Sequence, residues 1–239
     1  MKMNRNNNEN LIDIREFCNG NFQIDIFGVK RKAPLIQVKA EKWIVVNDFL
    51  CFGCDVEFTK KAGKELSERI GSFSPEVILT PGTKAISLAY EISRILNLPK
   101  YVLARKTHKD TEGEVIKTRI TSITTPEPCE LYIEKEDAKY LRGKRVVLVD
   151  DVVSTGKTMQ GLKTLATESG AKICAIAVVW IEGPGAFETF IDEFREERFV
   201  FIDVFPLYST GTTYEELLKE KERVESKIKC QNIRVPKLS

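Results

Sequence analysis

The sequence predicts an α/β fold, a doubly wound and mainly parallel sheet, preceded by a small β-rich segment. Two observations predict it. From residue 59 onward, short apolar runs alternate with stretches of helical periodicity, as in a parallel sheet covered on both faces. Residues 22–49 instead alternate apolar with polar side chains, as in a short antiparallel meander. We therefore expect an N-terminal tail and β-rich hood or edge subdomain over 1–58, a core over 59–212 and a charged helix and tail over 213–239.

Composition indicates an ordinary globular protein. Of the 239 residues, 42% are hydrophobic and 30% charged, and no apolar run approaches the roughly 18 residues of a membrane helix. The net charge of +2 is too small to suggest a nucleic-acid surface. The first ten residues are polar and rich in Asn, so we expect a frayed tail rather than a secretory signal. We expect a cytoplasmic protein.

The six cysteines lie far apart, which favours reduced thiols. Cys51 and Cys54 form a C-x-x-C pair, but no second Cys or His pair stands at metal-ligand spacing. We expect incidental thiols, and a metal or redox role is the alternative.

The first half of the core shows three elements and a loop. Thr59 is an available N-cap for a helix that ends at Gly71. The run EVILT is a strand, TKAISLAYEISRIL a helix and KYVLARK a second strand. The following stretch, THKDTEGEVIKTR, is polar without apolar periodicity, so we expect a mobile loop.

The second half continues the alternation. RITSITT and ELYI resemble a hairpin, RVVLV is a buried strand, and KTMQGLKTLATESG is a helix stopped by Gly170. KICAIAVVWI is a further strand, and FVFIDVFPLY is expected to be the last. The segment YEELLKEKERVESKIK predicts a charged, solvated helix.

The most informative stretch is RVVLVDDVVSTGKTMQGL, an apolar strand followed by two acidic residues, a Ser/Thr/Gly loop and a helix. In a doubly wound sheet, ligands bind at the carboxyl ends of strands, and a helix N-terminus favours an anion. Gly156 lets the backbone approach a phosphate, and Ser154, Thr155 and Thr158 offer hydroxyl donors. The stretch predicts a phosphate cradle.

A nucleotide P-loop is excluded, because G-x-x-x-x-G-K-[ST] would need glycine where this chain has Asp151. Two adjacent carboxylates before a phosphate loop cost free energy unless they meet hydroxyls or a cation. A sugar diol is the natural partner.

This stretch resembles the signature of the type I phosphoribosyltransferases, which bind 5-phosphoribosyl-1-pyrophosphate (PRPP), and VVLVDDVVSTGKT matches it throughout. The resemblance implies that Asp150 and Asp151 hold the ribose and that the loop holds the 5-phosphate. The implied phosphate contacts are Ser154, Thr155, Gly156, Lys157 and Thr158.

The pyrophosphate needs a second site. The turn TPGTKA resembles the family's short pyrophosphate loop, which assigns contacts to Gly82, Thr83, Lys84 and Ala85. A plain helix N-terminus is the alternative. Arg105 and Lys106 resemble the pair that enters the catalytic loop of adenine phosphoribosyltransferases and the purine-operon repressor. With Lys109, these cations are suited to neutralising a leaving pyrophosphate. A solvated basic loop is the alternative, and we assign no role to His108.

The hairpin region departs from the adenine enzymes. Their catalytic glutamate falls on Thr125 here, and Glu127 is the nearest carboxylate. A carboxyl group near the purine would assist proton transfer. We expect Glu127 to substitute, and a plain loop carboxylate is the alternative.

The resemblance implies an enzyme that makes a nucleoside 5'-monophosphate and pyrophosphate from PRPP and a purine, adenine first, with hypoxanthine, guanine or xanthine as alternatives. It also implies Mg²⁺, held mainly through PRPP with Asp150 and Asp151 as further ligands, and a homodimer. The rival class is a non-catalytic PRPP-binding regulator. The chain lacks the helix-turn-helix pattern of a DNA-binding repressor domain, so we expect no nucleic-acid partner.

Overall fold

The structure, a computed structural model, describes residues 21–26, 28–39, 42–51, 53–106, 113–120, 129–182, 198–205 and 208–209. Its centre is a five-stranded parallel sheet in the order β10-β9-β8-β4-β5. The strands are β4 (Val77–Pro81), β5 (Tyr101–Ala104), β8 (Arg145–Val153), β9 (Lys172–Glu182) and β10 (Phe199–Phe205). The predicted fold class is confirmed.

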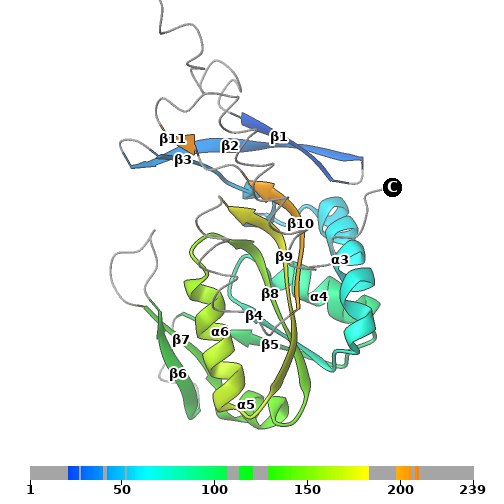
Figure 1. The fold of residues 1–239 in the computed structure, drawn as a ribbon, viewed down its shortest axis with the longest axis vertical. Helices are drawn as coiled ribbons and strands as arrows, with labels where there is room; N and C mark the ends of the chain where they lie inside the picture. The colour runs from blue at the N-terminus through cyan, green and yellow to red at the C-terminus, as the bar shows by residue number, and fades with distance from the viewer. Residues whose placement is uncertain are drawn as a thin grey trace, which may run out of the picture.

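Helices cover both faces of this sheet, as Figure 1 shows. One face packs against α3 (Val56–Ile70) and α4 (Ile86–Ile95), in a core that includes Trp180. The other face packs against α5 (Lys135–Leu141), α6 (Lys157–Glu168) and the hairpin of β6 (Val115–Ile120) with β7 (Cys129–Glu134). Strands buried on both faces explain the continuous apolar runs of the sequence.

The N-terminal meander forms a second, antiparallel sheet in the order β1-β2-β3-β11. Its strands are β1 (Asn21–Ile26), β2 (Val29–Lys39), β3 (Lys42–Val45) and β11 (Tyr208–Ser209), and the short helix α2 (Asp48–Cys51) follows β3. This sheet lies across the end of the parallel sheet at which β9 and β10 finish (Figure 1). We call it the hood sheet.

Three local predictions were wrong. The N-cap of α3 is Asp55, whose carboxylate accepts a hydrogen bond from the Phe58 amide at 3.0 Å, and Thr59 is buried inside the helix. Part of the expected loop after Lys106 is β6, which pairs with β7 from Val115 to Ile120. The expected last strand is divided between two sheets, because β10 ends at Phe205 and β11 pairs with β3.

No helix in the described part of the chain is long and apolar enough to cross a membrane. The segment expected as a charged C-terminal helix lies outside the described residues.

Candidate functional site

Three neighbouring strands, β4, β5 and β8, bring predicted residues to one edge of the parallel sheet. β4, β5, β8 and β9 run parallel and lie side by side, so their carboxyl ends meet. The edge carries the Asp150–Asp151 pair on β8, the 82–85 turn after β4, and Arg105 and Lys106 after β5. Strand order reverses between β8 and β4, which is the switch point at which such sheets bind ligands.

The two aspartates are buried, with Asp150 7% and Asp151 5% exposed. The Asp151 amide donates a hydrogen bond to Asp150 Oδ1 at 2.9 Å. Burial raises the pKa of Asp150 well above its ordinary value; the neighbouring Asp151 charge adds to the rise, and the Lys106 charge opposes it. Ionisation of Asp150 is thus unfavourable until hydroxyl donors or a cation arrive.

The loop after β8 leads directly into α6. Gly156 is the N-cap of the helix and has a φ of 74°, a left-handed conformation that glycine adopts at little cost. Ser154, Thr155, Lys157 and Thr158 are half-buried around it. Backbone amides at the start of a helix point at this space, so the loop has the geometry of an anion site.

Glu182 is a site residue that sequence reasoning missed. It is the last residue of β9, and its carboxyl group accepts a hydrogen bond from the Ser154 side chain. Burial raises the pKa of Glu182, while Ser154 and the charge of Lys84 lower it. A carboxylate directly after a buried strand was the signal that identified Asp150, and KICAIAVVWIE carries the same signal.

The turn after β4 lies close to the end of β5. The Gly82 amide donates a hydrogen bond to the Ala104 carbonyl at 2.7 Å, which holds the start of the turn against the sheet. Thr83 and Lys84 are exposed at this edge, and Ala85 is buried beneath them. The charge of Lys84 acts on Glu182 and that of Lys106 on Asp150, so both lysines are near enough to interact electrostatically with these carboxylates.

Arg105 is held by contacts with β7. Its backbone exchanges hydrogen bonds with Tyr132 at 2.9 and 3.0 Å, and its guanidinium donates to Glu134 Oε1 at 2.9 Å. The Arg105 side chain therefore contacts β7 of the hairpin. Glu127, Lys109, Thr125 and His108 lie outside the described residues.

A magnesium ion suits this site only as one shared with a ligand. Among the described residues, no group of three or more His, Cys, Asp or Glu side chains is placed to hold a metal ion. Asp150 and Asp151 supply two adjacent carboxylates, and Mg²⁺ is commonly bound by one or two carboxylates together with substrate phosphates. These two carboxylates would hold the ion together with phosphate oxygens of a ligand.

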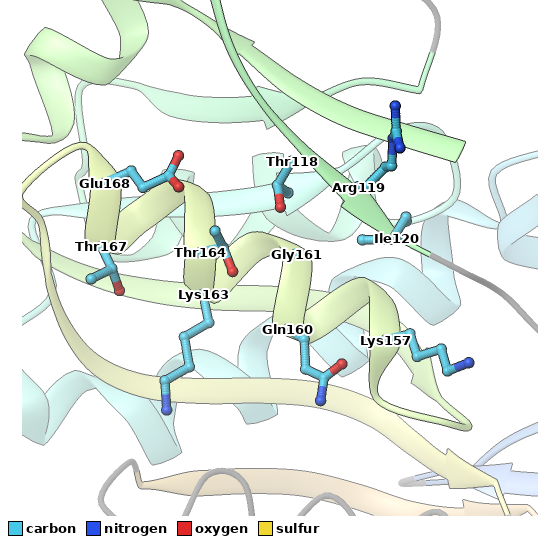
Figure 2. A pocket seen from close by; sticks show the side chains of 10 residues that line it. All are labelled: Thr118, Arg119, Ile120, Lys157, Gln160, Gly161, Lys163, Thr164, Thr167 and Glu168. Atoms are coloured by element: carbon cyan, nitrogen blue, oxygen red, sulfur yellow. The ribbon is translucent and has the colours of Figure 1, made fainter. Parts of the chain in front are cut away.

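A groove of about 790 Å³ lies on the outer side of α6, between this helix and β6 (Figure 2). Thr118, Arg119 and Ile120 line it from β6, and of the predicted site residues in the described chain it includes Lys157 alone. The groove is thus separate from the acidic pair.

Cys54 has a free thiol within 3.3 Å of Thr59 Oγ1.

Comparison with known proteins agrees with this geometry. The family model of the phosphoribosyl transferase domain matches residues 57–210. The purine biosynthesis transcriptional repressor PurR of Bacillus subtilis is 31% identical over 134 residues, 56% of this chain and 46% of the repressor. Xanthine phosphoribosyltransferase of Lachnoclostridium phytofermentans is 30% identical over 148 residues, 61% of this chain and 74% of that enzyme. The chain spans about half the length of the repressor.

Solved structures show the same fold. Adenine phosphoribosyltransferase of Trypanosoma brucei, in complex with AMP, pyrophosphate and ribose-5-phosphate, superposes with a TM-score of 0.58 at 19% identity, covering 80% of this chain and 78% of that one. The enzyme of Leishmania donovani gives 0.57 at 20% identity, covering 80% and 78%. The family match, the curated relatives and the parallel sheet with its acidic strand end agree, and the chain belongs to the phosphoribosyl transferase domain family.

Proposed function

We propose that this protein transfers the 5-phosphoribosyl group of PRPP to a free purine base and releases pyrophosphate. One observation carries the proposal: the buried Asp150–Asp151 pair is followed, after a short loop, by a glycine-capped helix N-terminus at the switch point of the sheet. A sugar phosphate satisfies both halves of this arrangement, because its hydroxyls donate to the carboxylates and its phosphate accepts from the loop amides.

In this proposal the chain acts by position and charge. Asp150 and Asp151 accept hydrogen bonds from the ribose hydroxyls and stabilise positive charge that develops on the ribosyl ring. Residues Ser154–Thr158 bind the 5-phosphate, and the turn Gly82–Ala85 binds the pyrophosphate. Lys84, Arg105, Lys106 and Lys109 stabilise the leaving group. A bound Mg²⁺ would neutralise pyrophosphate charge.

The base is a purine, and two observations count against adenine, which the resemblance placed first. Thr125, where the adenine enzymes have glutamate, weakens the assignment to adenine, and several curated relatives are xanthine phosphoribosyltransferases, among them that of Clostridioides difficile at 27% identity. Structural similarity to adenine enzymes below 25% identity informs on the fold alone. Adenine, our first expectation, is therefore to be tested directly against xanthine, with Glu127 proposed as the carboxyl group near the base.

A second candidate function is regulation by PRPP binding without catalysis. The similarity to the Bacillus subtilis repressor and to the purine activator PurR of Lactococcus lactis, 26% identical, favours it. Both candidates use the same PRPP site, and they differ only in whether a base is joined to the ribose. The homodimer, the domain boundaries and the cytoplasmic location stay predictions.

The test is pyrophosphate release from PRPP and Mg²⁺ with adenine, xanthine, hypoxanthine and guanine supplied separately, beside PRPP affinity without base. Release with one purine establishes the enzyme and its substrate. Tight PRPP binding without release for any base supports the regulator. Absence of PRPP binding contradicts both.

Variants of the acidic pair test the site assignment. We expect Asp150→Asn and Asp151→Asn each to weaken PRPP binding by roughly 10²-fold or more, because each loses a charge-assisted hydrogen bond. Asp137→Asn is the matched control, since Asp137 lies on α5 and pairs with Lys100. Unchanged PRPP binding in both site variants would contradict the assignment.

A further inference from the structure

Asn47 connects the hood sheet to the acidic pair. It lies between β3 and α2, where its backbone carbonyl accepts the Leu50 amide at 3.0 Å. The preceding residue, Val46, donates its amide to the Pro34 carbonyl at 2.9 Å, so the backbone is held on both sides of Asn47. The Asn47 side chain is buried, 3% exposed, although Asn is usually found at the surface.

The buried amide has a specific partner. Asn47 Nδ2 donates a hydrogen bond to Asp151 Oδ2 at 2.8 Å, across 104 residues of sequence. A hydrogen bond to an ionised acceptor is roughly twice as strong as a neutral one, and a buried carboxylate is costly without donors. Asp151 is thus fixed by a residue that belongs to the hood and not to the parallel sheet.

The chemistry of the donor matters for a sugar site. A lysine or arginine at this position would neutralise Asp151 and reduce its attraction for hydroxyls and Mg²⁺. A neutral amide fixes the orientation of the carboxylate and leaves its charge in place. It also restricts the rotation of the carboxylate about its terminal bond, so less entropy is lost when a ribose hydroxyl binds.

We propose that Asn47 is a positioning residue for PRPP, which orients Asp151 toward the ribose through its own hydrogen bond to that carboxylate. The proposal rests on the function proposed above, because Asp151 is taken as a ribose ligand. A positioning role for Asn47 differs from a general stabilising role. Any contact between the hood and the core would stabilise the fold, whereas only Asn47 would act on Asp151.

Arg31 provides the matched control. It lies on β2 of the hood sheet, and its guanidinium Nη2 donates to Asp55 Oδ1 at 3.2 Å and Glu57 Oε2 at 2.8 Å at the start of α3. Arg31→Ala therefore removes a contact between hood and core that does not involve the acidic pair. If docking alone were important, Arg31→Ala and Asn47→Ala would affect PRPP binding alike.

The experiment measures the PRPP dissociation constant by calorimetry in the presence of Mg²⁺ for the wild type and for four variants: Asn47→Ala, Asn47→Asp, Asn47→Gln and Arg31→Ala. We expect Asn47→Ala to weaken PRPP binding by about 10-fold, the loss typical of one hydrogen bond to a charged group. Asn47→Asp should weaken it further, since it places a carboxylate against Asp151. Asn47→Gln should recover part of the affinity, and Arg31→Ala should change it less than about 3-fold.

Kinetics and melting temperatures separate the outcomes. In Asn47→Ala the KM for PRPP should rise more than kcat falls, while the KM for the base stays near the wild-type value. Melting within about 4 °C of the wild type shows that the variant is folded. Equal PRPP affinity of Asn47→Ala and wild type, or an equal loss in Arg31→Ala, would overturn the proposal. A wild type that does not bind PRPP would overturn the proposed function instead.

Discussion

At the scale of single residues, Asp150 is where stability and the proposed function conflict. Its carboxyl group is buried next to Asp151, and burial together with that neighbouring charge raises its pKa well above 3.8. The folded chain therefore holds this proton more tightly than the unfolded chain. The stability that Asp150 contributes is fully present below about pH 3.8 and is lost as the pH rises through the raised pKa.

Asp150→Asn should therefore stabilise the protein without ligand, although it weakens PRPP binding. At pH 7 we expect the melting temperature to rise by about 2–4 °C, the shift that corresponds to about 1 kcal/mol in a domain of this size. The difference from the wild type should shrink as the pH is lowered toward 4. Scanning calorimetry at several pH values measures it, with Asp137→Asn as the control that gains no stability. A lower melting temperature at pH 7 would show that Asp150 is already stabilised as an anion.

The residues that sequence reasoning found and missed differ in the range of their contacts. Asp150, Asp151 and the phosphate loop follow one another along the chain, so a local motif contains them all. Asn47 and Glu182 reach the site only through the hood and the pairing of β9 with β8. Glu182 at least carried a local signal, a carboxylate at the end of a buried strand, whereas the role of Asn47 depends on docking of the hood, which a single sequence does not specify.

At the scale of elements, α6 must lie very close to the β6–β7 hairpin. A Cβ atom at Gly161 would be 2.5 Å from Ile120 Cγ2 and 3.2 Å from Leu131 Cδ2. The Ile120 methyl is attached to a stiff β-branched side chain, so it has little freedom to move away. Glycine at position 161 therefore reflects close packing rather than a requirement for an unusual backbone conformation.

Gly161→Ala should destabilise the protein, although alanine is the better helix former. Overpacking costs about 1–3 kcal/mol, and the gain in helix propensity offsets about 1 kcal/mol. We expect the free energy of unfolding in urea to fall by about 1 kcal/mol. Gly71→Ala is the control, because its Cβ would meet only Leu96 Cδ2 at 3.8 Å with an ordinary φ of −56°. It should be neutral or slightly stabilising, and an equal effect of both substitutions would contradict the packing argument.

Elements with strong periodicity were predictable, whereas the strand β6 and the first turn of α3 were not. The five parallel strands follow from continuous apolar runs, because burial on both faces leaves that pattern in the sequence. In β6, Ile116, Thr118 and Ile120 alternate with more polar residues, but the threonine conceals the alternation, and only pairing with β7 makes it a strand. For α3, the exposed Val56 concealed the first turn, so that Thr59 was preferred to Asp55 as the cap.

At the scale of the whole molecule, the hood sheet and the parallel sheet share one hydrophobic core. Ile24, Val29 and Val45 of the hood belong to the same buried cluster as Phe58 and Trp180. The hood sheet contains strands from both sides of the parallel sheet in sequence: β1 to β3 precede it, and β11 follows just after Phe205 ends β10. The two sheets should therefore unfold together, although they are separate in hydrogen bonding.

The two tryptophans allow this to be tested, because Trp43 lies in β3 of the hood and Trp180 in β9 of the core. Trp43→Phe leaves emission from the core, and Trp180→Phe leaves emission from the hood. In each variant, the urea transition followed by fluorescence should coincide with that followed by far-ultraviolet circular dichroism. A Trp43 transition at lower urea than the dichroism transition would show that the hood unfolds first.

Phe205→Ala tests more directly whether the hood sheet and the parallel sheet unfold together. Phe205 is fully buried and stacks on Trp180 with ring centroids 4.3 Å apart, and Phe58 of α3 stacks on Trp180 at 5.5 Å. The substitution leaves a cavity beside the point where the chain passes into the hood, at a cost of about 3–5 kcal/mol. If the core is shared, Trp43 emission reports the same loss of stability as circular dichroism when Phe205→Ala is combined with Trp180→Phe. If only the dichroism transition moves and the Trp43 transition is unchanged, the hood sheet is stable on its own. The contact of Asn47 with Asp151 would then not depend on this part of the core.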